Sequence, residues 1–137
     1  MLLDFEGIGD FYPVGSYYSG AGGPNYGVTF SPGTVGVRDG IGTFTNEPSP
    51  VTVAVSLSAS MLMNVAAGFN TSLSFYYAAY KTNWTVNIFD GPDGTGNLLA
   101  TSSGAYNNAG TCGSYNVCVW TPLTINFAGT ARSVVFS

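Results

Sequence analysis

Apolar and polar residues alternate with a period of two in several separate stretches of the chain. The clearest is the run VTVAVSL at 51–57, and the alternation recurs at 72–78, 84–90 and 123–127, with shorter runs at 26–30 and 97–102. Successive side chains of a β-strand point to opposite faces, so this period is typical of half-buried strands. No window of 11 residues has the apolar spacing of an amphipathic helix. We expect a core that contains Val53, Val55, Leu57, Val65, Phe69, Leu73, Phe75, Val86, Ile88, Leu123, Ile125, Phe127, Val134 and Phe136.

Glycine, proline and asparagine separate these runs. Turn-forming clusters lie at 31–33 (SPG), 47–50 (EPSP), 90–97 (DGPDGTGN) and 127–131 (FAGTA). Short strands between such turns predict an all-β fold, an antiparallel β-sandwich of the jelly-roll or Greek-key type. The loose segment 13–25 is expected to be a long loop that crosses between the sheets. The length and the absence of a linker predict a single sandwich domain over residues 1–137.

Charged residues make up only 7% of the chain, against roughly a quarter in ordinary globular proteins. The net charge is −4 and the only cationic side chains are Arg38, Lys81 and Arg132, which argues against nucleic-acid and anionic-membrane partners. No apolar run reaches the roughly 18 residues of a membrane-spanning helix, so no membrane insertion is expected. The start MLLDFEG has no basic residue, so we do not expect it to be a signal peptide. The richness in Tyr, Asn, Ser and Thr and the two cysteines nevertheless predict a secreted or cell-surface protein, with a leaderless cytosolic chain as the alternative.

Several segments together resemble one family. They are LDFEGIG, YGVTFSPG, MNVAAGFNTSLSFYY, VNIFDGPDGTGNLLATS and WTPLTINFAGTARSVVF, with a cysteine pair just before Trp120. In order and spacing the chain is similar to an exported bacterial β-sandwich domain that is common in proteins bearing the PEP-CTERM sorting tail. The resemblance implies a secreted, jelly-roll-like, non-catalytic module with no well-defined biochemical activity. It also implies a further strand after residues 134–136 and a sorting tail, and the given sequence stops before both.

Catalytic chemistry has few candidates in this chain. There is no histidine, which excludes Ser-His and Cys-His pairs, and one lysine and two arginines do not make a phosphate clamp. Glycoside hydrolysis needs two carboxyls at roughly 5–9 Å across a cleft, and nothing in the sequence places two of the seven acids in that way. We therefore expect no enzymatic activity and no cofactor other than a structural calcium ion.

Calcium binds carboxylate and carbonyl oxygens, and two places offer them. The loop 90–97 contains Asp90 and Asp93 among glycines, although turn chemistry alone also explains these residues and is the interpretation we favour. Asp4 and Glu6 are predicted on one face of a strand. The resemblance implies an ion there, between the first and last strands, with a partner acid in the strand that the given sequence lacks. At Asp4 and Glu6 a calcium site and an empty site are equally open.

Cys112 and Cys118 have five residues between them. A zinc site would need further ligands, and the chain has no histidine and no second cysteine pair. An isolated, close pair in an exported-looking chain predicts a Cys112–Cys118 disulfide that fixes the loop before Trp120. The chain-entropy model assigns so small a loop only about 2 kcal/mol.

Aromatic residues are the remaining candidates for a binding surface. Tyr76, Tyr80 and Trp84 crowd one predicted hairpin, and Tyr106 and Tyr115 lie in predicted loops. Tyr76 and Tyr77 are strand neighbours, so one faces the core and the other faces outward or is covered by a neighbouring element. Outward tyrosines can stack on sugar rings or pack against another subunit, and ordinary filling of a sandwich explains them equally well.

Two functions of different classes follow. The first is a structural or adhesive subunit of an extracellular matrix or filament, whose partners are copies of itself or other matrix components. The sparse charge supports it, because lysine usually guards an edge strand and the chain has only Lys81. An extended segment, from residues 2–6 or 13–25, would fill the slot of the missing strand in the same or a neighbouring copy. The alternative is a carbohydrate-binding module, stabilised by calcium, that binds glycans through surface tyrosines and tryptophan.

Overall fold

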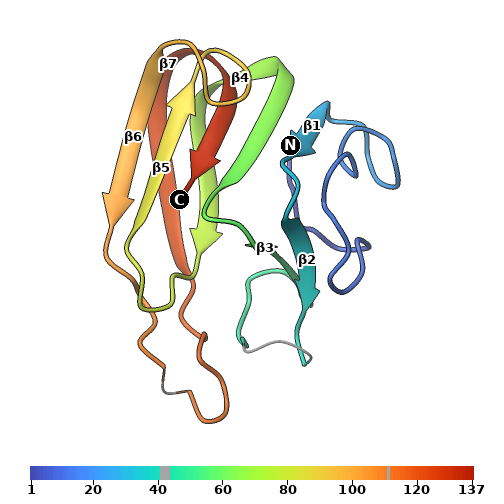
Figure 1. Cartoon of the computed structure of the whole chain (residues 1–137), viewed down its shortest axis with the longest axis vertical. Coiled ribbons are helices and arrows are strands. Elements are labelled where there is room, and N and C mark those ends of the chain that lie inside the picture. Colours follow the sequence, from blue (N-terminus) through green and yellow to red (C-terminus); the bar gives the residue numbers. More distant parts are fainter. Residues whose placement is uncertain (41–43, 111) are drawn as a thin grey trace.

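The computed structural model describes residues 1–40, 44–110 and 112–137. These residues form strands and no helix, so the predicted antiparallel β-sandwich is confirmed. The strands are β1 (Val28–Phe30), β2 (Thr34–Arg38), β3 (Thr52–Ser56), β4 (Met61–Tyr77), β5 (Trp84–Phe89), β6 (Leu98–Gly104) and β7 (Thr121–Phe136). They form a five-stranded sheet in the order β1-β4-β7-β5-β6 and a two-stranded sheet of β2 and β3 (Figure 1). Strands that are distant in sequence, such as β4 and β7, are therefore neighbours in the sheet, which is typical of Greek-key connections.

Two strands are much longer than the others. β4 has 17 residues and β7 has 16, and they pair antiparallel from end to end. The register of this pair shifts twice, between residues 64 and 72 of β4. Gly68, Thr71 and Gly129 lie at these irregularities with φ values of 77°, 79° and 94°. Both strands bend there and double back at the top of Figure 1, so that the two halves of each strand lie in different layers.

The segment 127–131, predicted as a turn, is part of this bend. β7 continues through it to Phe136. Gly129 supplies the positive φ that a bulged bend requires and that a residue with a side chain adopts only with strain. The glycine marks a change of direction correctly, whereas the prediction that a strand ends here is wrong.

The core between the layers is formed largely by the predicted residues. Val65, Val86, Ile88, Ile125 and Val134 are buried in the main cluster, and Phe69, Leu73, Phe75, Leu123, Phe127 and Phe136 pack against it. Val53 and Val55 belong to a second, smaller cluster around β2 and β3. Leu57 was expected in the core and is instead 64% exposed, because it follows the last residue of β3 and no layer covers it there.

The N-terminal segment packs on the main core without joining a sheet. Leu3 and Phe5 contact the core, but residues 1–5 have no strand pairing. The expectation that Asp4 and Glu6 share a strand face is therefore wrong: Asp4 is exposed, and Glu6 lies in a turn. Phe5 between them has a φ of 63°, which turns the chain and sends the two carboxylates in different directions.

Candidate functional site

The segment 13–25 crosses between the two sheets, as predicted, and the chain around it covers one edge of each. At the two-stranded sheet, Gly36 N donates to Tyr12 O (2.9 Å) and Val14 N donates to Thr34 O (2.9 Å). At the five-stranded sheet, Phe30 N donates to Gly15 O (2.8 Å) and the N–H of residue 28 donates to the carbonyl of residue 18 (3.3 Å). The outer edges of β1 and β2 are thus occupied by the protein's own backbone.

Tyr18 anchors this covering segment. Its side chain is 1% exposed, and its hydroxyl accepts a hydrogen bond from Phe5 N (2.6 Å) and donates to Asp4 Oδ1 (3.4 Å). Burial, with the Asp4 carboxylate beside it, raises the pKa of the Tyr18 hydroxyl above its ordinary value. The sequence predicts a loop at this tyrosine, within the segment 13–25. The loop is real, but the ring fills the core.

β6 forms the opposite edge of the five-stranded sheet, and its outer side is open. Thr85 of β5 exchanges two backbone hydrogen bonds with Ser137 on the β7 side (2.7 and 2.9 Å). The backbone groups of successive residues in a strand point to alternate sides. Val86, the next residue of β5, therefore bonds to β6, where it lies opposite Ser102. The N–H and C=O groups of Thr101 and Ser103 consequently point away from the sheet, and no hydrogen bond reaches them from the described part of the chain.

No charged residue guards this edge. β6 reads LLATSSG, without lysine, acid or proline. Natural edge strands are usually blunted by one of these devices or by a covering loop. Charge is scarce in the strands generally, since Arg38 at the end of β2 and Arg132 in β7 are the charged residues within them. β6 therefore presents a neutral row of unpaired backbone groups to the solvent.

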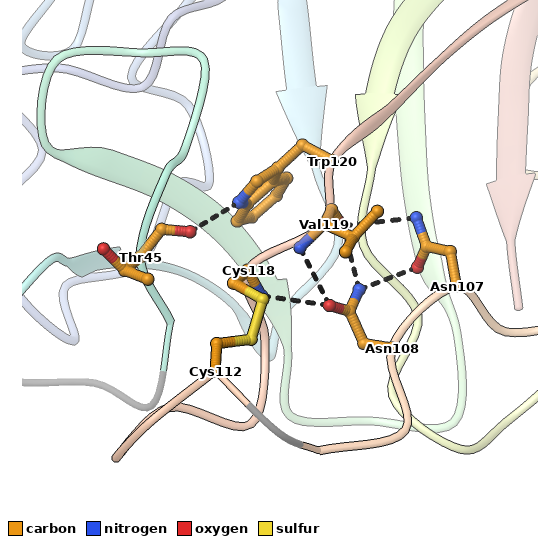
Figure 2. Close-up of a disulfide and its surroundings, with 7 residues drawn as sticks. All are labelled: Thr45, Asn107, Asn108, Cys112, Cys118, Val119 and Trp120. Atoms are coloured by element: carbon orange, nitrogen blue, oxygen red, sulfur yellow. Dashed lines mark hydrogen bonds between the residues drawn. A yellow bond between two sulfur atoms is a disulfide. The ribbon is translucent and has the colours of Figure 1, made fainter.

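The predicted disulfide is present and closes the loop between β6 and β7. Cys112 and Cys118 are bonded, with 6.2 Å between their Cα atoms (Figure 2). Beside them lies Asn108, which is 4% exposed. Its Oδ1 accepts from Cys118 N and Val119 N (both 2.9 Å), and its Nδ2 donates to Val119 O (2.9 Å). Sequence reasoning missed this side chain, although an Asn-Asn pair in a loop next to a disulfide is a plausible signal for side-chain bonding to backbone.

The same loop joins the two hydrophobic clusters. Trp120 Nε1 donates to Thr45 O (3.0 Å), as Figure 2 shows, and its ring meets Phe44 edge to face with centroids 6.1 Å apart. Thr45 N donates in turn to Val117 O (3.0 Å). The disulfide-closed loop therefore fastens the connection between β2 and β3 to the rest of the sandwich.

Asp90 and Asp93 hold the hairpin between β5 and β6. The carboxylate of Asp90 accepts from the side chain and the backbone of Asn97 (2.9 and 2.7 Å), and these hydrogen bonds hold the Asp90 pKa below its usual value. Asp93 exchanges two hydrogen bonds with the side chain of Asn64 on β4 (2.7 and 2.9 Å). Both acids thus have partners within the protein, which agrees with the interpretation as a turn.

Asp4 and Glu6 do not form a common site. Asp4 bonds to Tyr18 and to Glu6 N, whereas Glu6 accepts from Val51 N (3.0 Å), Thr52 N (2.7 Å) and Thr52 Oγ1 (3.0 Å) at the start of β3. In the described ranges no three acidic, histidine or cysteine side chains converge as a metal would require. Calcium binding at Asp4, Glu6, Asp90 and Asp93 stays a prediction.

The predicted aromatic surface divides into exposed and packed members. Tyr76, Tyr80 and Tyr106 are 55%, 38% and 47% exposed, whereas Tyr115 is half-buried. Trp84 packs over Gly104, where a Cβ atom would lie 2.7 Å from the indole, and its ring centroid is 4.7 Å from that of Tyr77. As expected for strand neighbours, Tyr76 faces outward while Tyr77 faces inward. An aromatic surface can therefore involve the three exposed tyrosines but not the indole of Trp84.

No protein-family model, curated protein or solved structure matches the chain. The resemblance to a domain of PEP-CTERM proteins accordingly stays a prediction. The fold and its chemistry define the class at a coarser level, an antiparallel β-sandwich with one disulfide, and the disulfide indicates an oxidising environment. The part of the chain that the structure describes contains no helix that could cross a membrane.

Proposed function

We propose that this protein is a non-catalytic, extracellular structural module that associates with copies of itself through a sheet edge. The observation that carries the proposal is the open side of β6, where the backbone groups of Thr101 and Ser103 have no partner on a strand without charge or proline. Addition of a strand to such an edge gains main-chain hydrogen bonds with little demand on side chains.

Three further features support this role. The disulfide between Cys112 and Cys118 fits a secreted protein, since such bonds persist outside the reducing cytosol. The chain also lacks histidine and has only seven acids, so the usual acid–base pairs of enzymes have few candidates. A polar surface with few charges suits contact with other subunits better than electrostatic recognition of a charged ligand.

Light scattering coupled to size-exclusion chromatography, over a wide range of protein concentration, tests the proposal. We expect the mass to rise with concentration and to change little with salt, because hydrogen bonds between neutral strands are not screened. A chain that stays monomeric at the highest accessible concentration would exclude the proposed function. Negative-stain microscopy of the associated material distinguishes closed particles from filaments.

Carbohydrate binding is the second candidate, and one observation favours it. Tyr80 and Tyr106 are exposed and come from two segments that the backbone joins, since Asn107 N and Asn108 N both donate to Ala79 O (3.2 and 3.0 Å). Exposed tyrosines can stack on sugar rings, although the Lys81 ammonium lies 5.1 Å from the centre of the Tyr80 ring. Affinity electrophoresis in gels that contain polysaccharides tests this: retarded migration that is lost in Tyr80→Ala and Tyr106→Ala supports glycan binding, and unaltered migration in every gel opposes it.

A further inference from the structure

We infer that the partner of β6 is the β6 strand of a second copy, paired antiparallel about a two-fold axis at Ser102. This inference rests on the proposed function and names its partner and register. It predicts a closed dimer in which two five-stranded sheets become one continuous sheet of ten strands.

The other end of the same sheet argues against an open-ended chain of copies that joins β6 to β1. A chain of copies that extends this sheet would pair β6 of one copy with β1 of the next. The β1 edge is already used, since its residues 28 and 30 donate to the backbone of Tyr18 and Gly15. Of the two outermost strands of this sheet, β6 is the one whose edge is free, so an extension of the sheet from end to end pairs β6 with another β6. Two identical edges that meet make an isologous contact, which closes after two copies.

The alternation of backbone groups sets the register. Thr101 and Ser103 have outward N–H and C=O groups, whereas Ser102 faces β5. Leu99 is the extra residue of a bulge, because Ala100 lies opposite Ile88 and Leu98 lies opposite Phe89. Pairing Thr101 with Ser103 of the second copy, and the reverse, uses both regular outward residues and avoids the bulge. Each such pair exchanges two hydrogen bonds.

The side chains are compatible with this register. Thr101 and Ser103 are exposed, and the pairing places a threonine hydroxyl beside a serine hydroxyl twice. No like charges face one another, because β6 contains no charged residue. An identical strand is consequently as complementary to this edge as any neutral peptide, and it is present wherever the protein is.

Proline at position 101 tests the main-chain contact. Thr101→Pro removes an N–H that has no partner within the monomer, and proline is tolerated at such edge positions. We expect dimerisation to weaken about tenfold or more in sedimentation experiments, since the dimer loses two hydrogen bonds. Thr101→Val is the matched control: it changes the side chain, keeps the N–H and should dimerise like the parent. Circular dichroism establishes that both variants are folded.

Cysteine cross-linking tests the register without a disruptive change. Ser102 would lie opposite its own copy in a pair with Cα atoms about 4.5 Å apart, within reach of a disulfide. Ser102→Cys should form a covalent dimer under mild oxidation, whereas Ser103→Cys, which lies opposite Thr101 of the second copy, should not. The native disulfide leaves no other free cysteine among the described residues.

The outcomes separate the two proposals. Loss of association in Thr101→Pro together with cross-linking at 102 supports the two-fold pairing. Association of Thr101→Pro at parental strength, or cross-linking at 103 instead of 102, overturns it and leaves self-association through another surface. A parent protein that is monomeric at all concentrations overturns both.

Discussion

The ring of Phe75 lies 5.4 Å from the ring of Phe136, edge to face, although the two residues belong to opposite ends of the β4–β7 ladder. Phe75 is opposite Leu123, whereas Phe136 is opposite Met61. In a straight ribbon they would be about 45 Å apart, at roughly 3.3 Å per residue. The contact therefore exists because the ribbon bends and lays one half over the other.

This contact predicts that Phe75 stabilises the sandwich as a link between its layers. Phe75→Ala should lower the free energy of unfolding by about 2–4 kcal/mol, because it leaves a cavity between the two halves of the ribbon. Tyr76→Ala is the matched control on the same strand, since Tyr76 is 55% exposed and should cost about 0.5 kcal/mol or less. Urea denaturation followed by circular dichroism measures both. Equal losses in the two variants would show that the layers do not depend on this contact.

Asn108 is expected to be a polar support of the loop between β6 and β7. Asn108→Ala would leave Cys118 N and Val119 N without their acceptor, at a cost of about 2–4 kcal/mol in unfolding free energy. Asn116→Ala in the same loop is exposed and should leave stability nearly unchanged. Thermal unfolding of the two variants and the parent measures the difference: we expect a lower melting temperature in Asn108→Ala and an unchanged one in Asn116→Ala. An unchanged melting temperature in Asn108→Ala would contradict the assigned role.

Loss of the disulfide should loosen the attachment of Trp120. Replacing Cys112 and Cys118 by serine should reduce the free energy of unfolding by about 2 kcal/mol, the value expected for a small closed loop. In a Trp84→Phe background Trp120 is the sole tryptophan, and its fluorescence should shift to the red as its contacts with Phe44 and Thr45 weaken. A reductant should produce the same shift in the disulfide-containing protein and none in the serine variant. If the emission wavelength of Trp120 is the same with and without the disulfide, other contacts hold Trp120 in place.

Glu47 should make stability depend on pH. Burial, with Asp39 and Glu6 nearby, raises the pKa of its carboxyl above 4.5, so the folded state disfavours the charged form. The penalty is present at neutral pH and disappears as the pH falls below the unfolded pKa of about 4.5. Glu47→Gln should therefore raise the melting temperature at neutral pH, and the difference from the parent should shrink in acid.

Glu6 provides the contrast for that experiment. Its carboxylate accepts three hydrogen bonds from Val51 and Thr52, so Glu6→Ala should destabilise the protein at neutral pH by about 1–3 kcal/mol. Opposite effects of the two substitutions would distinguish a partly buried, poorly partnered acid, Glu47, from an acid that anchors the chain, Glu6. A lower melting temperature in Glu47→Gln at neutral pH would refute the assignment.

Local chemistry explains which parts of the candidate sites the sequence could predict. Cys112 and Cys118 pair across a short loop, so their spacing alone indicated the disulfide. The carboxylates of the hairpin 90–97 likewise follow from turn chemistry. The hydrogen bond from Thr52 N to the Glu6 carboxylate joins residues that are 46 positions apart, and no residue near Glu6 in the sequence predicts it. The burial of Tyr18 was missed for the same reason, because its partners Phe5 and Asp4 lie in another segment.

The alternation of apolar and polar residues determined by itself that this protein is an all-β sandwich and which side chains form most of its core. That follows because each strand's inward face must be apolar whichever strands lie beside it. Only the tertiary structure decided that β4 and β7 continue through the bend into both layers: Gly129 marks a change of direction locally, but the contact of Phe75 with Phe136 that stabilises the folded ribbon joins distant residues. It also decided that β6 is an open edge while β1 is closed, because an edge is defined by the strands and loops that pack beside it, and those come from distant parts of the chain.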